Sequence, residues 1–174
     1  MVTITISGSP GSGKTTAAKL LAEKLKLKYV YSGAIFREQA KKHKMTLEEF
    51  GRYCEKHKEI DQQLDDYQLQ ILTKGNVIVE GRISGWIAYR NSIPAVKVLI
   101  DTDIDTRASR IVKRENGDVN KRKKEMVARE KSEATRYKKY YDIDIKDRSI
   151  YDVVIDSGDK TSEEIVSIIV KKLG

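Results

Sequence analysis

Short runs of β-branched and apolar residues recur along the chain and alternate with longer amphipathic stretches. Four runs lie at residues 2–7, 76–80, 95–100 and 151–156, and a weaker fifth lies at 28–31. The runs are nearly continuous in apolar residues, which is typical of strands that are buried on both faces of a parallel sheet. We therefore expect a parallel sheet of five strands.

The stretches between these runs predict helices. Apolar positions repeat there at intervals of three and four residues, which favours amphipathic helices over 14–26, 59–74, 103–115 and 118–141. Two Thr-x-x-Glu sequences, beginning at Thr46 and Thr161, have the spacing of a capping box and should each open a further helix. Strands that alternate with helices predict an α/β fold, a three-layer sandwich built as a single domain over residues 1–174.

Composition narrows the classes of protein without choosing a function. Charged residues make up 34% of the chain and no apolar stretch reaches eighteen residues, so we expect no membrane span and a cytoplasmic protein. A single cysteine, Cys54, excludes an internal disulfide and any site with several thiolate ligands. The net charge of +8 suits an anionic partner, which could be a nucleic acid, an acidic membrane surface or a phosphorylated small molecule.

A glycine-rich loop follows the first predicted strand and precedes the first predicted helix. Its sequence, GSPGSGKT at residues 8–15, matches G-x-x-x-x-G-K-[ST] at every fixed position and is a P-loop. Its backbone N–H groups and the helix N-terminus can surround phosphate oxygens, and Lys14 can reach the β- and γ-phosphates. The predicted ATP-binding residues of this segment are Gly8, Ser9, Pro10, Gly11, Ser12, Gly13, Lys14, Thr15 and Thr16.

A P-loop occurs in GTPases, motor ATPases and small-molecule kinases alike. A GTPase should carry an N-K-x-D segment, which this sequence lacks, and an oligomeric ATPase is usually a larger chain with a Walker-B acidic pair. The remaining basic residues favour a kinase, because phosphoryl transfer needs cations from several segments to neutralise two sets of phosphates.

Two arginines follow predicted strands. Arg37 closes the segment that begins with Ser32 and Gly33, and Arg82 comes directly after Gly81. Ligands of parallel α/β sheets bind beyond the carboxyl ends of strands, so we expect both arginines to hold the phosphate of an acceptor. Thr15 should ligate Mg²⁺, and Glu80, which ends a strand, should hold the ion through water.

A third group of arginines flanks a Gly-Asp break at residues 117–118. Arg107, Arg110 and Arg114 share one helix face before the break, and Arg129 and Arg136 share another after it. Two arginine-bearing helices joined in this way predict a short lid, over about 114–130, that closes on the transferring phosphate. A pair of solvated, charged helices would carry the same pattern.

Taken together, these segments resemble the nucleoside monophosphate kinases, and most of all the archaeal type of cytidylate kinase. The resemblance covers nearly the whole chain and is carried by GSPGSGKTTAAKL, SGAIFRE, TLEEFGRY, EIDQQLDDYQ, VEGRISGW and AREKSEATRYKKYYDIDIKDRS. Adenylate kinases carry D-G-[FY]-P-R where this chain has Glu80-Gly-Arg-Ile, and this departure counts against AMP.

The resemblance implies transfer of the ATP γ-phosphate to CMP or dCMP with Mg²⁺, by a protein with a mobile monophosphate-binding helical segment at about 33–66. Lys14, Arg110, Arg129 and Arg136 would then act on the transferring group. Arg37 and Arg82 would hold the CMP phosphate, and Arg107 and Arg114 would contact ATP. We expect small-molecule substrates only, no nucleic acid or membrane partner, and a monomer.

Recognition of cytosine needs a partner for its exocyclic amino group as well as donors for its N3 and O2 acceptors. Asp61, Asp65 and Gln68 fall on one face of the predicted 59–74 helix and are our candidates, Asp61 first. Two alternatives remain open. One is a P-loop kinase for AMP, shikimate or dephospho-coenzyme A, and the other is an ATP-dependent RNA-binding regulatory module.

Overall fold

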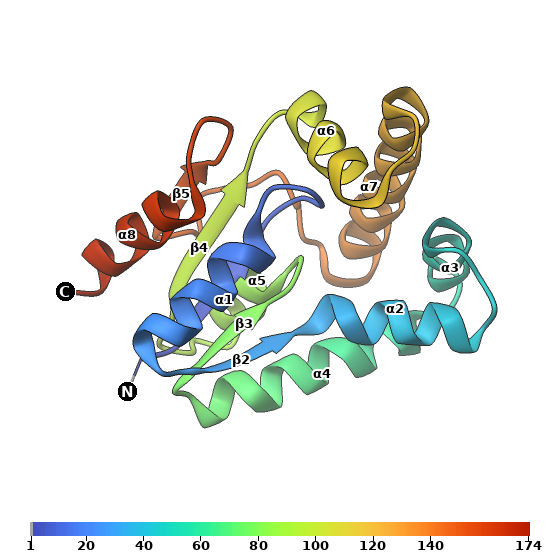
Figure 1. Ribbon diagram of the computed structural model, residues 1–174. Coiled ribbons are helices and arrows are strands. Elements are labelled where there is room, and N and C mark those ends of the chain that lie inside the picture. Colours follow the sequence, from blue (N-terminus) through green and yellow to red (C-terminus); the bar gives the residue numbers. More distant parts are fainter. Residues whose placement is uncertain (1) are drawn as a thin grey trace.

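Five parallel strands form one sheet in residues 2–174, which a computed structural model describes (Figure 1). The strand order is β2-β3-β1-β4-β5, and every pair of neighbours is parallel. The strands are β1 (Ile4–Ser7), β2 (Lys28–Tyr31), β3 (Val77–Glu80), β4 (Val96–Asp101) and β5 (Val153–Asp156). The predicted sheet and its five strands are confirmed.

Helices connect the strands and cover the sheet. They are α1 (Lys14–Leu25), α2 (Ser32–Lys42), α3 (Leu47–Cys54), α4 (Lys58–Lys74), α5 (Ser84–Arg90), α6 (Ile104–Glu115), α7 (Val119–Tyr141) and α8 (Ser162–Leu173). Helices predicted from periodicity agree with these bounds within one or two residues. Helix α2 had no periodic signal of its own, although the resemblance implied a helical segment there.

The sheet separates two hydrophobic cores, because successive side chains of a strand point to opposite faces. Ile4 and Ile6 of β1 pack with α1 and α8 on one face. On the other face, Val77 and Val79 of β3 pack with α4, α5 and the end of α7. Burial on both faces explains the continuous apolar runs in the sequence.

Four helices gather beyond the carboxyl ends of the strands. Figure 1 shows α2, α3, α6 and α7 at that end of the sheet, while the two chain termini lie at the opposite end. Smaller clusters hold these helices together, with Phe50 buried between α2 and α3 and Met126 buried between α6 and α7. The strand ends and the P-loop therefore face these four helices.

Both predicted capping boxes form, and the one at α8 supports a stability prediction. The Thr161 hydroxyl accepts from the Glu164 N–H at 3.2 Å, and the Glu164 carboxylate accepts from the Thr161 N–H at 2.7 Å. Thr161→Ala should lower the free energy of unfolding by about 1 kcal/mol, measured in urea. Ser162→Ala, one residue further on, is the control, and equal stability of the two variants would contradict this account.

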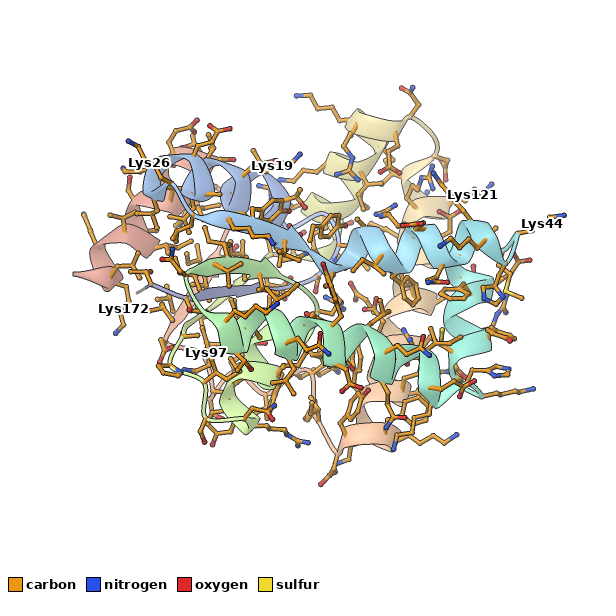
Figure 2. The ribbon with its side chains drawn as sticks, turned by 90° about the horizontal axis from the view of Figure 1, so that it is seen from below. Lys19, Lys26, Lys44, Lys97, Lys121 and Lys172 are labelled. Atoms are coloured by element: carbon orange, nitrogen blue, oxygen red, sulfur yellow. The ribbon has the colours of Figure 1, made fainter. Side chains whose placement is uncertain are left out.

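Lysines are spread over the molecule. Figure 2 shows Lys26, Lys97 and Lys172 around the end of the sheet near the C-terminus, Lys19 over α1, and Lys44 and Lys121 near the far helices. The positive charge of these side chains therefore does not collect on one face.

Candidate active site

The P-loop passes from β1 to α1 in a conformation that requires its glycines. Gly8, Gly11 and Gly13 have φ angles of +146°, +81° and +87°. A Cβ at Gly8 would overlap the carbonyl oxygen of Ile100, and one at Gly11 would lie 2.7 Å from the carbonyl oxygen of Arg107. The loop therefore lies close to β4 and α6, and α1 begins at Lys14 directly after it.

Lys14 lies at the centre of the loop. Its ammonium donates to the Ser9 carbonyl at 2.8 Å, and the residue is only 9% exposed. Burial lowers the pKa of Lys14 to about 8; the Glu80 carboxylate opposes this effect, and Arg82 and Arg129 add to it. A cation short of counter-charge is suited to binding polyphosphate, because the phosphates supply the negative charge that the site lacks.

Glu80 and Thr15 form a candidate Mg²⁺ position beside Lys14. The Thr15 hydroxyl donates to Glu80 Oε1 at 2.8 Å, and the Tyr29 hydroxyl donates to Glu80 Oε2 at 2.5 Å. No group of three or more His, Cys, Asp or Glu side chains suited to a metal exists in residues 2–174. Mg²⁺ fits this arrangement nevertheless, because it takes few protein ligands and completes its octahedron with phosphate oxygens and water.

A cavity of about 440 Å³ opens from the P-loop toward the surrounding helices. The predicted site residues in its wall come from the P-loop, α1, α2, α4, the segment after β3, α6 and α7. They are Pro10, Gly11, Lys14, Thr15, Ser32, Gly33, Arg37, Asp61, Asp65, Gln68, Glu80, Gly81, Arg82, Arg114, Arg129 and Arg136. Segments far apart in the sequence therefore meet here, as expected at the carboxyl end of a parallel sheet.

Glu133 of α7 joins two of the cavity's arginines. Arg82 Nε donates to Glu133 Oε2 at 2.5 Å, and Arg129 Nε donates to Glu133 Oε1 at 3.1 Å. Burial alone would raise the pKa of Glu133, but the neighbouring guanidinium groups of Arg82, Arg129 and Arg136 outweigh it and hold that pKa at about 2. Arg82 also donates to the Gly8 carbonyl at 2.6 Å, which connects α7 to the P-loop.

Asp61 and Arg136 form a buried ion pair. Arg136 Nη1 lies 2.6 Å from Asp61 Oδ1 and 2.9 Å from Asp61 Oδ2, and the two residues are 3% and 2% exposed. Burial raises the pKa of Asp61, while the charge of Arg136 opposes that rise. Both carboxylate oxygens of Asp61 already have a partner, so Asp61 is less available to a ligand than the sequence predicted.

Asp65 and Gln68 lie one and two turns further along α4. Gln68 Nε2 donates to Asp65 Oδ1 at 3.2 Å, and burial raises the pKa of Asp65 to about 7. Three buried polar atoms of this wall lack a hydrogen bond of good geometry in residues 2–174: Asp65 Oδ2, which the Tyr141 hydroxyl approaches, Gln68 Oε1 and Arg136 Nε. Two acceptors and one donor are thus unsatisfied on neighbouring residues of the cavity, and unsatisfied buried polar groups in a wall indicate a ligand or water.

Two predicted arginines lie outside the wall of this cavity. Arg107 donates to the carbonyls of Thr102 and Pro10, at 3.1 and 3.3 Å, and pairs with Glu130. Arg110 donates to the Ser157 hydroxyl and carbonyl, at 3.1 and 2.6 Å. Arg107 therefore supports the backbone of the P-loop at Pro10 and does not line the cavity. The predicted loop residues Gly8, Ser9, Ser12, Gly13 and Thr16 also lie outside the wall.

Sequence reasoning missed several side chains of the site. Glu133, Tyr29 and Phe36 were not singled out, and Tyr137 was expected to pack in the core, yet Glu133, Phe36 and Tyr137 line the cavity and Tyr29 bonds to Glu80. A signal for Glu133 was present, since it lies four residues after Arg129 and three before Arg136. The other three are aromatic residues, which usually pack in a core, so nothing in the sequence distinguished them from ordinary core residues.

Residues 2–174 contain no helix that is both long and apolar enough to cross a membrane.

Comparison with known proteins gives matches over most of the chain. A family model described as the cytidylate kinase-like family matches residues 3–159. The chain is 47% identical to a cytidylate kinase of Methanocaldococcus jannaschii over 167 residues, 95% of this chain and 94% of the relative. It is also 47% identical to a cytidylate kinase of Archaeoglobus fulgidus over 169 residues, 97% and 92% of the two chains.

A solved structure supports the fold. The structure of shikimate kinase from Acinetobacter baumannii in complex with shikimate covers 99% of this chain and 93% of its own, with a TM-score of 0.61 and 18% identity. At this identity the likeness shows a common architecture and not a common acceptor.

Proposed function

The chain belongs to the cytidylate kinase-like family, and from that membership and its cavity we propose that it transfers the γ-phosphate of ATP to CMP or dCMP. The observation that supports the choice of base is the set of three unpartnered polar atoms, Asp65 Oδ2, Gln68 Oε1 and Arg136 Nε. Cytosine has an amino group that donates to the two acceptors, and ring acceptors that take a hydrogen bond from the arginine. Uracil has a carbonyl in place of that amino group and an N3–H in place of the N3 acceptor, so it would set an acceptor against the carboxylate and a donor against the arginine.

The phosphates are assigned to separate parts of the cavity. The P-loop and Lys14 bind the β- and γ-phosphates of ATP, and Arg82 and Arg37 bind the phosphate of the acceptor. Thr15 and Glu80, through water, hold Mg²⁺, which neutralises charge on the β- and γ-phosphates when it is bound. The segments 33–66 and 114–130 would close over the two nucleotides and exclude water.

The transfer itself needs no covalent intermediate. An oxygen of the acceptor phosphate forms a bond to the γ-phosphorus as the bond to the bridging oxygen of ADP breaks. Lys14 and Arg129 compensate the charge on the transferring oxygens, which both side chains can approach from the cavity wall. We assign Arg136 to the base and not to the transferring group, because its guanidinium is bonded to Asp61.

Arg107, Arg110 and Arg114 take different supporting roles in this proposal. Arg107 keeps the P-loop in place through Pro10, and Arg110 lies beside the loop at Ser157, on the ATP side. Arg114 lines the cavity at the end of α6 and would contact the phosphates of ATP when the 114–130 segment closes.

Asp65→Asn tests the assignment of the base site. An amide has one acceptor and one donor in place of two acceptors, so kcat/KM for CMP should fall about 10- to 100-fold. Turnover of UMP should rise relative to CMP, because the new donor can pair with the uracil carbonyl. The measurement is the ratio of kcat/KM for CMP and UMP in both proteins, with Asp66→Asn as the control. An unchanged ratio would contradict the assignment.

Asp65 should also make CMP binding depend on pH. The ionised carboxylate is the form that accepts from the amino group, so the KM for CMP should fall as pH rises through about 7 and level off above it. The CMP phosphate loses its second proton at about pH 6, and this added charge should also lower the KM for CMP as pH rises. In Asp65→Asn the KM for CMP should therefore no longer change near pH 7, while its change near pH 6 should remain.

A further inference from the structure

Glu133 has a position that the proposed reaction does not by itself explain. It is 3% exposed, lies on α7 and forms no hydrogen bond with the P-loop in residues 2–174, yet it bonds to two arginines that line the cavity. It is ionised throughout the neutral range. Burying a carboxylate costs free energy unless opposite charges offset its desolvation, and here the two guanidinium groups provide those charges.

The bonds to Glu133 use only one edge of each arginine. Both Arg82 and Arg129 donate through Nε, and Arg82 donates in addition through Nη1 to the Gly8 carbonyl. Arg82 Nη2 and both Nη groups of Arg129 have no acceptor in residues 2–174. The paired ends of the guanidinium groups, which make forked contacts to phosphate oxygens, are thus mostly left available.

A single carboxylate also fixes the distance between the two arginines. Arg82 follows β3 and Arg129 lies on α7, so the two arginines do not share a helix or strand that would fix the distance between them. Glu133 binds one with each oxygen and keeps both in the wall of the cavity that Lys14 also lines. Without such an anchor, three like charges in a confined site would repel and separate.

We propose that Glu133 is a positioning residue, which orients Arg82 toward the acceptor phosphate and Arg129 toward the transferring phosphoryl group through one shared carboxylate. The inference rests on the proposed phosphotransferase function. Glu133 itself touches neither nucleotide and accepts no proton, because a carboxylate with a pKa of about 2 is a weak base.

Glu133→Gln tests this role with little change of shape. The glutamine oxygen can accept from one arginine, but its amide N–H₂ meets the N–H of the other, so one guanidinium loses its anchor. We expect kcat with CMP to fall about 10- to 100-fold, because a misplaced group costs about that much. The KM for ATP and the shape of the pH–rate profile should stay as in the wild type. If Glu133 were instead a general base, Glu133→Gln would remove one limb of the pH–rate profile.

Asp142→Asn is the matched control, since Asp142 is an exposed acid at the C-cap of the same helix, in an i,i+4 pair with Lys138. Glu133→Asp keeps the charge with a shorter side chain and should recover part of kcat. Active-site titration with ATP corrects for any unfolded protein. Wild-type kcat in Glu133→Gln, or a loss explained entirely by the unfolded fraction, would overturn the proposal.

The proposed function and the positioning role of Glu133 can be refuted separately. A wild-type protein that does not phosphorylate CMP contradicts the proposed function, whatever Glu133 does. The anchoring is then judged from the ¹⁵Nε–¹H resonances of Arg82 and Arg129, assigned with Arg→Lys variants. Both should shift in Glu133→Gln and stay in Asp142→Asn, and unshifted resonances would overturn the proposal independently of any acceptor.

Discussion

Lys14→Met should lower kcat about 10³-fold with CMP and ATP as substrates. Negative charge spreads over the γ-phosphoryl oxygens in the transition state, and Lys14 is a buried cation within the P-loop, whose backbone N–H groups would surround those oxygens. Methionine keeps most of the length of the side chain and removes the charge. A buried ammonium whose pKa is lowered to about 8 contributes little to stability, so the thermal midpoint should not fall.

Lys19→Met is the control for this variant. Lys19 lies on the same helix, exposed to solvent, and Figure 2 shows it at the surface. The control should retain wild-type kcat and bind ATP normally by calorimetry. If Lys14→Met retained more than about a tenth of the wild-type kcat, the phosphate-binding assignment would be wrong, because a catalytic cation contributes more than this.

Arg82→Met should lower kcat/KM for CMP about 10²- to 10³-fold. Three contacts are lost together: the fork to the acceptor phosphate, the bond to Glu133 and the bond to the Gly8 carbonyl of the P-loop. Glu133 is then left buried with Arg129 as its remaining hydrogen-bonded partner, so the thermal midpoint should also fall. Arg82→Met should thus lower both activity and thermal stability, whereas Lys14→Met should lower activity alone.

Arg82→Lys and Arg52→Met complete the comparison. Lysine keeps the charge at position 82 but cannot make a forked contact, so it should restore stability better than activity. Arg52 is an exposed arginine of α3 whose partner is Glu48, and its replacement should change neither quantity. Equal kcat/KM for CMP in Arg82→Met and wild type would exclude Arg82 from the acceptor site.

The sheet, the P-loop and most helices were predictable because local patterns determine them. Apolar runs identify strands that are buried on both faces, and the strict spacing of Gly8, Gly13 and Lys14 leaves few other conformations for that loop. The site residues that follow strands, Arg37 and Arg82, were predictable for a related reason. The end of a parallel strand fixes where the next residue lies, and both arginines line the cavity.

Side-chain pairing on helices was harder to predict. Periodicity places Asp61, Asp65 and Gln68 on one face of α4, but it cannot show that Asp61 is already paired with Arg136, 75 residues away. In the same way, the common face of Arg107 and Arg110 did not show that both lie outside the cavity wall, bonded to Pro10 and Ser157. These partners depend on how helices pack, which a single sequence does not encode locally.

Release of ADP with ATP and Mg²⁺, measured in parallel for several acceptors, tests the central claim most directly. The acceptors are CMP, dCMP, UMP, AMP, GMP, shikimate and dephospho-coenzyme A, with a reaction lacking acceptor as the blank. The account predicts turnover of CMP and dCMP well above all others. Turnover of AMP or shikimate alone would contradict the base site while keeping the phosphate site. No acceptor-dependent release, together with RNA binding that weakens steeply with salt, would contradict the kinase assignment itself.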